Sequence, residues 1–153
     1  MMDWLSSPNR ALCFEAPSLG FRDDSPRRRR RNLMKVVMLV EDDDETREAL
    51  AAILEDARYR VLRAANGAAA WSLLQDHGAV CDIILLDLMM PVMNGWDFRR
   101  KQKASPDFST IPVVLMSAGG NSASSCADLG TSDYIAKPVE VEELLNKIQR
   151  YCS

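Results

Sequence analysis

The chain has 153 residues, 47% of them hydrophobic and 27% charged, a composition typical of one globular domain rather than a disordered or fibrous chain. No apolar run approaches the ~18 residues of a membrane span, the N-terminus lacks a signal-peptide pattern, and four scattered cysteines with one histidine show no zinc-ligand spacing. The net charge of −3 joins a basic segment, residues 1–32, to an acidic remainder, residues 33–153, which predicts an extension followed by one domain.

Residues 1–32 show neither helical nor strand periodicity, and three prolines would interrupt any regular element. Five consecutive arginines, Arg27–Arg31, repel one another and favour a solvated, extended chain. We therefore expect a disordered basic extension. Three interpretations stay open: a solvated tail, a stretch read from a misassigned start codon with Met34 as the true start, or arginines that touch nucleic-acid phosphates or anionic lipid.

From residue 34 onward, short apolar runs alternate with amphipathic segments. Residues 36–40 (VVMLV) are continuously apolar, as in a strand that is buried on both faces. The next segments predict a helix, a shorter alternating strand and, after the break at Asn66-Gly67, a second helix, over residues 46–57, 59–64 and 68–75.

The second half of the chain repeats this alternation. Residues 82–87 (DIILLD) predict another fully buried strand, and residues 91–95 predict a turn. The remaining pattern predicts a helix, two strands and a closing helix, over residues 96–103, 111–116, 133–136 and 140–151. Residues 99–101 and 103 are basic, and we expect them to form the solvated side and end of their helix rather than the alternative, a binding patch.

Strands that alternate with helices predict an α/β fold with a parallel sheet covered on both faces. Such sheets bind ligands at the carboxyl ends of their strands. The residues that directly follow the predicted strands are Glu41 and Asp42, Asp87, Ser117 and Lys137. The pattern therefore places three acids, one hydroxyl and one lysine at one edge of the sheet.

These side chains suit phosphoryl transfer. Carboxylates that lie close together repel one another unless a cation sits among them, and hard oxygen ligands suit Mg²⁺. A lysine supplies a mobile positive charge for a phosphoryl oxygen. A carboxylate can itself be the nucleophile, and Asp87 holds the central position for that role.

The chain resembles the receiver domains of bacterial response regulators. The matching pieces are LVEDD, LLDLMMPVMNG, VVLMSA and DYIAKP, at residues 39–43, 85–95, 113–118 and 133–138. Their order and spacing match the family from Lys35 to about Tyr151. The resemblance implies a doubly wound, flavodoxin-like receiver fold with five parallel strands in the order 2-1-3-4-5.

The resemblance also implies a metal site. Glu41 and Asp42 match the acidic pair that binds Mg²⁺ in the family, whereas Asp43 is assigned to the following loop. Asp87 matches the phosphoacceptor, which also ligates the metal. Met89 matches the position whose backbone carbonyl completes the coordination.

Three further positions match the family's switch. Ser117 corresponds to the hydroxyl that turns toward the phosphoryl group, and Lys137 to the lysine that contacts it. Tyr134 corresponds to the aromatic residue whose rotation accompanies that movement. The chain departs from the family between Ser117 and Lys137, where a Ser- and Gly-rich stretch predicts only a short or frayed helix at residues 123–129. The alternative is a segment that becomes ordered upon phosphorylation or binding.

The implied function is that of a stand-alone, cytoplasmic phosphorelay protein rather than a conventional enzyme. Its implied partners are a histidine kinase or phosphotransfer protein and an output protein of unknown identity, and we expect no nucleic-acid binding by the domain. One alternative is a receiver-fold binding module that works without phosphate. A phosphatase of the haloacid-dehalogenase type would need a second acid two residues after its nucleophile, where this chain has Met89.

Overall fold

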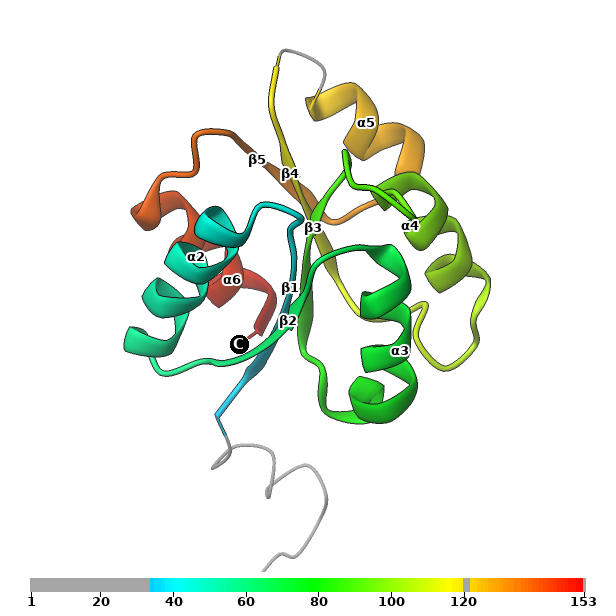
Figure 1. The fold of residues 1–153 in the computed structure, drawn as a ribbon, viewed down its shortest axis with the longest axis horizontal. Coiled ribbons are helices and arrows are strands. Elements are labelled where there is room, and N and C mark those ends of the chain that lie inside the picture. The colour runs from blue at the N-terminus through cyan, green and yellow to red at the C-terminus, as the bar shows by residue number, and fades with distance from the viewer. Residues whose placement is uncertain (1–33, 120–121, 153) are drawn as a thin grey trace, which may run out of the picture. The chain divides into compact units, whose positions relative to one another are not determined.

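The computed structural model describes residues 34–119 and 122–152, so the predicted disordered extension over residues 1–32 lies outside the described residues. The described part contains one parallel five-stranded sheet (Figure 1) with the strand order β2-β1-β3-β4-β5. The strands are β1 (Val36–Val40), β2 (Arg60–Ala64), β3 (Ile83–Asp87), β4 (Val113–Ser117) and β5 (Asp133–Ala136). The predicted fold class and strand order are thus confirmed.

Helices connect the strands and cover both faces of the sheet (Figure 1). They are α2 (Asp44–Asp56), α3 (Gly67–His77), the 3₁₀ turn η2 (Gly78–Val80), α4 (Gly95–Ala104), α5 (Ser122–Leu129) and α6 (Val141–Cys152). Helices α2 and α6 pack on one face, whereas α3, α4 and α5 pack on the other. No helix in the described ranges is long and apolar enough to cross a membrane.

The alternation of side chains along each strand divides the core into two apolar clusters. In β1, Met38 and Val40 point into the cluster under α3, α4 and α5, whereas Val37 and Leu39 point into the cluster under α2 and α6. All five residues of β1 are buried, which explains why this strand reads as an unbroken apolar run.

Polar side chains set the first residues of three helices. Asp43 accepts a hydrogen bond from the amide of Thr46 at 2.8 Å and so caps α2. Asn66 and Asn94 cap α3 and α4 in the same way. Each helix consequently begins one or two residues before the first residue expected from its apolar pattern.

Helix α5 forms where the sequence predicted a short helix, and α4 holds its C-terminal end. Arg99 of α4 donates from Nε to the carbonyl of Leu129 at 3.2 Å and from Nη2 to the carbonyl of Gly130 at 2.6 Å. Arg99 also donates to Gln102, whose amide donates to two carbonyls of the loop before β4. The expectation that Arg99 is solvated was wrong, because this residue is only 6% exposed.

Both edge strands of the sheet carry charged residues. In β2, Arg60 is exposed and Arg63 pairs with Glu48 at 3.3 Å and with Glu55 at 3.0 Å, both on α2. The opposite edge strand, β5, begins with Asp133. The edges therefore differ from the central strands, which are apolar except for Asp87 at the end of β3 and Ser117 at the end of β4.

Candidate functional site at the carboxyl edge of the sheet

Three acidic side chains meet where β1 and β3 end. Glu41 and Asp42 directly follow β1, and Asp87 is the last residue of β3. One carboxylate oxygen from each lies within 4.8 Å of the others, with Glu41 and Asp87 buried and Asp42 exposed. Because β1 and β3 are neighbouring parallel strands, their carboxyl ends place these acids side by side.

Lys137 joins this group from the far side of β4. It follows β5, and its backbone amide donates to the carbonyl of Ser117 at 2.8 Å. Its ammonium lies 2.7 Å from Glu41 Oε2 and 3.4 Å from Asp87 Oδ2. The side chain therefore crosses the end of β4 and links the two buried carboxylates.

The burial of these charges alters their protonation. Burial, followed by the charge of Glu41, raises the pKa of Asp87 to about 6, although the charge of Lys137 opposes the rise. Burial by itself would lower the pKa of Lys137, but the hydrogen bond to Glu41 and the charge of Asp87 outweigh it and raise that pKa. One lysine thus leaves the three acids with excess negative charge.

The donor set fits a hard divalent cation. Three convergent carboxylates supply the oxygen ligands that Mg²⁺ prefers, and the exposed Asp42 leaves one side open to water or phosphate oxygens. Asp43 lies outside this group, because its carboxylate caps α2. Arg47 of α2 donates to the backbone carbonyl of Glu41 at 2.9 Å and pairs with Asp44, which ties the first turn of α2 to the site.

The loop after Asp87 folds back tightly against its own strand. The amide of Gly95 donates to the carbonyl of Leu88 at 3.0 Å. A Cβ atom on Gly95 would lie 2.4 Å from the carbonyl oxygen of Asp87, so only glycine permits this approach. Met89 donates its amide to Asp87 Oδ1 at 3.3 Å, and the residue is 79% exposed.

The same loop contains a strained turn that the sequence did not reveal. Val92 has a φ of 67°, and the amide of Met93 donates to the carbonyl of Pro91 at 2.8 Å across it. This is a γ-turn with positive φ, which is unfavourable for a β-branched residue. Val92 is also among the most exposed apolar side chains of the described residues.

The two residues expected to act as a switch lie on β4 and β5. Ser117 is the last residue of β4 and is paired with Ala136. Tyr134 is paired with Leu115 and is half-buried. Both residues therefore lie on the two strands that follow β3, the strand of Asp87, in the sheet order.

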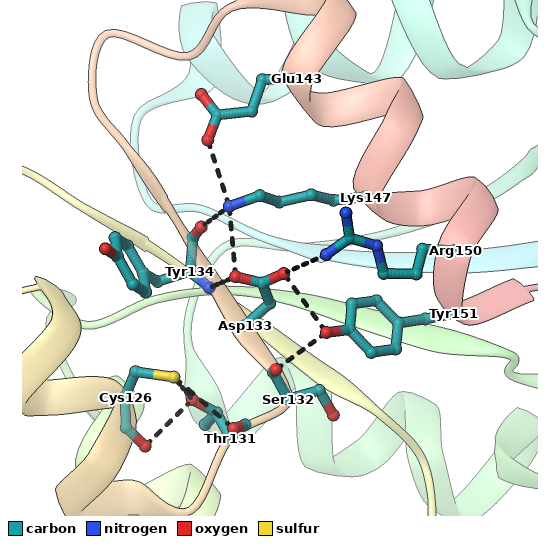
Figure 2. A network of polar contacts seen from close by, with 9 residues as sticks. All are labelled: Cys126, Thr131, Ser132, Asp133, Tyr134, Glu143, Lys147, Arg150 and Tyr151. Carbon is teal, nitrogen blue, oxygen red and sulfur yellow. Dashed lines mark hydrogen bonds and ion pairs between the residues drawn. The ribbon is translucent and has the colours of Figure 1, made fainter.

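A second polar network, which the sequence did not reveal, surrounds Tyr134 (Figure 2). Lys147 of α6 donates to Asp133 at 3.2 Å, to Glu143 at 3.1 Å and to the carbonyl of Tyr134. Tyr151 donates its hydroxyl to the carbonyl of Ser132 at 2.9 Å. The only sequence signal is the spacing of Glu143 and Lys147, four residues apart on one helix, which says nothing about Asp133.

The family model of the response regulator receiver domain matches residues 37–149 of this chain. The two-component response regulator-like protein PRR73 of Oryza sativa subsp. indica is 34% identical over 103 residues, which cover 66% of this chain and 13% of PRR73. The two-component response regulator ORR11 of the same organism is 33% identical over 106 residues, which cover 68% of this chain and 71% of ORR11.

A similar solved structure is the receiver domain of the sensor histidine kinase PA1611 from Pseudomonas aeruginosa PAO1. It has a TM-score of 0.71 and 29% sequence identity, and the match covers 78% of this chain and 98% of that chain. That structure contains a magnesium ion coordinated in its active site cleft.

Proposed function

This chain belongs to the response regulator receiver domain family, and we propose on that premise that Asp87 accepts a phosphoryl group in a two-component phosphorelay. Members of the family are signalling domains rather than conventional enzymes. The observation that carries the proposal is the convergence of Glu41, Asp42 and Asp87, with Lys137 linking the two buried acids.

Asp87 is the nucleophile in this proposal. A carboxylate oxygen of Asp87 attacks the phosphorus of a phosphohistidine, the N–P bond breaks, and its electron pair stays on the histidine of the donor. The amide of Met89, which donates to Asp87 Oδ1, helps to hold the carboxylate for this attack. The burial of Asp87 limits competition by water.

Lys137 supplies positive charge that can move. Its ammonium pairs with Glu41 and Asp87 here, and we expect it to exchange one of these oxygens for an oxygen of the phosphoryl group. The side chain is 24% exposed, so a limited movement would bring it to the group transferred to Asp87.

Mg²⁺ is the proposed cofactor. Glu41, Asp42, Asp87 and the backbone carbonyl of Met89 would hold the ion, and the bound ion would neutralise negative charge on the transferring group. The excess negative charge of the three acids makes the site electrostatically attractive to a cation.

The proposed output is a change on the face formed by α5, β5 and α6. The hydroxyl of Ser117 would donate to the phosphoryl group and Tyr134 would follow that movement, which alters a partner-binding surface. A histidine kinase or phosphotransfer protein of the cytoplasm would supply the phosphoryl group. The output partner would be a further protein that binds this face.

The proposal is tested by measuring the mass of the intact protein after incubation with acetyl phosphate and Mg²⁺. The wild type should gain one phosphoryl group only when Mg²⁺ is present, and D87N should gain none. D56N, which changes an exposed acid at the far end of α2, is the matched control and should label like the wild type.

Labelling of D87N at the wild-type level would exclude Asp87 as the acceptor. If the wild type gains no mass from acetyl phosphate or from a phosphohistidine donor, the chain is instead a receiver-fold binding module that works without phosphate.

A further inference from the structure

The backbone of Tyr134 is held by an ion pair rather than by a neighbouring strand. β5 is the last strand in the sheet order, so its outer side has no strand partner among the residues that the structure describes. The amide of Tyr134 donates to Asp133 Oδ1 at 2.8 Å, and Lys147 donates to the carbonyl of Tyr134. Since Asp133 and Lys147 also pair with each other at 3.2 Å, both backbone groups of Tyr134 bond to one Asp–Lys pair.

The ammonium of Lys147 is fixed in position. It has three N–H donors, and three acceptors surround it: Asp133 Oδ1, Glu143 Oε1 and the carbonyl of Tyr134 (Figure 2). The side chain is 17% exposed, so solvent screens these contacts only in part. A lysine with all its donors used and little exposure cannot move freely.

The same ammonium lies over the ring of Tyr134, 5.2 Å from its centroid. This distance is within the ~6 Å over which a cation is attracted by an aromatic face. The ring orientation seen here is therefore favoured by Lys147, whose own position is set by Asp133 and Glu143. Any rotation of the ring away from this cation loses that attraction.

We propose that Lys147 is a positioning residue that holds the ring of Tyr134 in the orientation of the unphosphorylated protein. This inference rests on the proposed function, in which Tyr134 moves when Asp87 is phosphorylated. A cation that stabilises one ring orientation makes the other orientation less populated. Because phosphorylation of Asp87 favours that other orientation in this proposal, the cation also makes phosphorylation less favourable. Removal of the cation should therefore shift Tyr134 toward its phosphorylated orientation and make acceptance of the phosphoryl group easier.

The test uses ¹⁹F NMR of the full chain labelled with 3-fluorotyrosine. The chain has three tyrosines and therefore gives three resonances. The variant Y134F identifies the resonance of Tyr134. In K147M without phosphodonor, this resonance should move toward its position in wild type treated with acetyl phosphate and Mg²⁺. Because we expect acceptance to follow the population of protein with Tyr134 in its phosphorylated orientation, the initial rate of labelling by acetyl phosphate should rise by roughly 3- to 10-fold, as expected for loss of one cation–aromatic contact.

Two variants separate positioning from general destabilisation. K147R keeps a cation over the ring and should restore the wild-type resonance and labelling rate. R150M removes another cation of α6, which pairs with Asp133 at 3.5 Å but has a side chain that is 66% exposed, and should leave Tyr134 unchanged.

An unchanged Tyr134 resonance in folded K147M would overturn the proposal, as would an equal shift in R150M. If K147M does not fold, K147Q replaces it, because glutamine keeps a donor but removes the charge; a wild-type resonance in K147Q then overturns the proposal. A wild type that takes no phosphoryl group contradicts the proposed function instead. In that case the Tyr134 resonances of unphosphorylated K147M and unphosphorylated wild type still show, by differing or coinciding, whether Lys147 acts on the ring.

Discussion

At the scale of single residues, the site places two buried carboxylates around one lysine. Glu41 and Asp87 both contact Lys137, and the exposed Asp42 adds a third negative charge. Negative charge in excess of its partners is unfavourable in a folded protein and favourable for binding a cation. The three carboxylates around one lysine therefore lower the stability of the metal-free domain, and a bound cation would relieve this cost.

Replacement of Asp87 by Asn should stabilise the metal-free protein at neutral pH. The pKa of Asp87 is raised to about 6, so between about pH 4 and 6 the folded state binds more protons than the unfolded state, and the stability of the wild type falls as the pH rises. D87N lacks this loss and should be more stable by about 1–2 kcal/mol at pH 7.5. Urea unfolding in EDTA from pH 4 to 8 measures the difference.

Mg²⁺ provides the control for this prediction. Because a bound ion would supply the missing positive charge in the wild type, saturating Mg²⁺ should shrink or reverse the advantage of D87N. A constant difference between the two proteins from pH 4 to 8 would show that the charge of Asp87 is not its cause.

The residues at strand ends were predictable, and those on helices were not. The rule that parallel sheets bind ligands at their carboxyl edge selects Glu41, Asp87 and Lys137 from the pattern of apolar runs alone. Arg99 and Lys147 lie on helices, where spacing shows which side chains share a face but not which partner that face meets. Their roles depend on tertiary contacts with distant segments.

At the scale of elements, α5 is a helix of low intrinsic propensity, and a residue of α4 caps its C-terminal end. Its own last turn has no basic residue, and Arg99 donates to the carbonyls of Leu129 and Gly130 instead. Cations at a helix C-terminus interact favourably with its dipole. The stability of α5 therefore depends on a residue of its neighbour.

Replacement of Arg99 by Met should destabilise the domain by about 2–3 kcal/mol, because it leaves the buried carbonyl of Leu129 and the partly buried carbonyl of Gly130 without this donor. Urea unfolding measures this loss, and hydrogen exchange should show faster exchange in α5 than in α2. R100M is the matched control, since Arg100 has a side chain that is 73% exposed and pairs only with Asp97 of its own helix among the described residues. Equal losses in the two variants would contradict the cap.

Replacement of Asp133 by Asn should loosen α6 from β5. Burial alone would raise the pKa of Asp133, but hydrogen bonds from the amide of Tyr134, from Lys147 and from Tyr151 lower it. The stabilisation is therefore present above about pH 4 and is lost as the pH falls through the lowered pKa. We expect D133N to cost roughly 1 kcal/mol at pH 7 and less at pH 2–3.

Urea unfolding of both proteins across this range measures the difference. D107N, an exposed acid in the loop before β4, should match the wild type throughout. A cost for D133N that is as large at pH 2 as at pH 7 would mean that the carboxylate charge contributes nothing.

The elements themselves were predicted to within a few residues, because apolar runs and helical spacing are strong in this chain. The ends were less predictable, since Asp43, Asn66 and Asn94 start their helices with side-chain caps before the apolar pattern begins. The γ-turn at Val92 could not be predicted at all. A β-branched residue opposes positive φ, and only the surrounding loop imposes it.

At the scale of the whole domain, Mg²⁺ binding should appear as added stability. A ligand that binds only the folded state contributes about 2.7 kcal/mol at 100 times its dissociation constant. Thermal unfolding with increasing Mg²⁺ should show a rising midpoint in the wild type and little rise in D42N, since Asp42 is exposed and its loss leaves the fold intact.

D56N is the control for a general effect of acidic residues, and its midpoint should rise like that of the wild type. Equal rises in D42N and the wild type would remove Asp42 from the set of metal ligands.

The two outer strands have a consequence for how copies of this protein meet. An open sheet leaves backbone groups at its edges, which another chain can use to extend the sheet. At one edge, the Asp133–Lys147 pair already occupies the amide and carbonyl of Tyr134; at the other, β2 presents Arg60 and Arg63. A second copy approaching either edge would have to displace or bury these charges. The arrangement therefore makes self-association through strand addition unfavourable. Helix faces and loops remain as the surfaces on which a partner can be recognised.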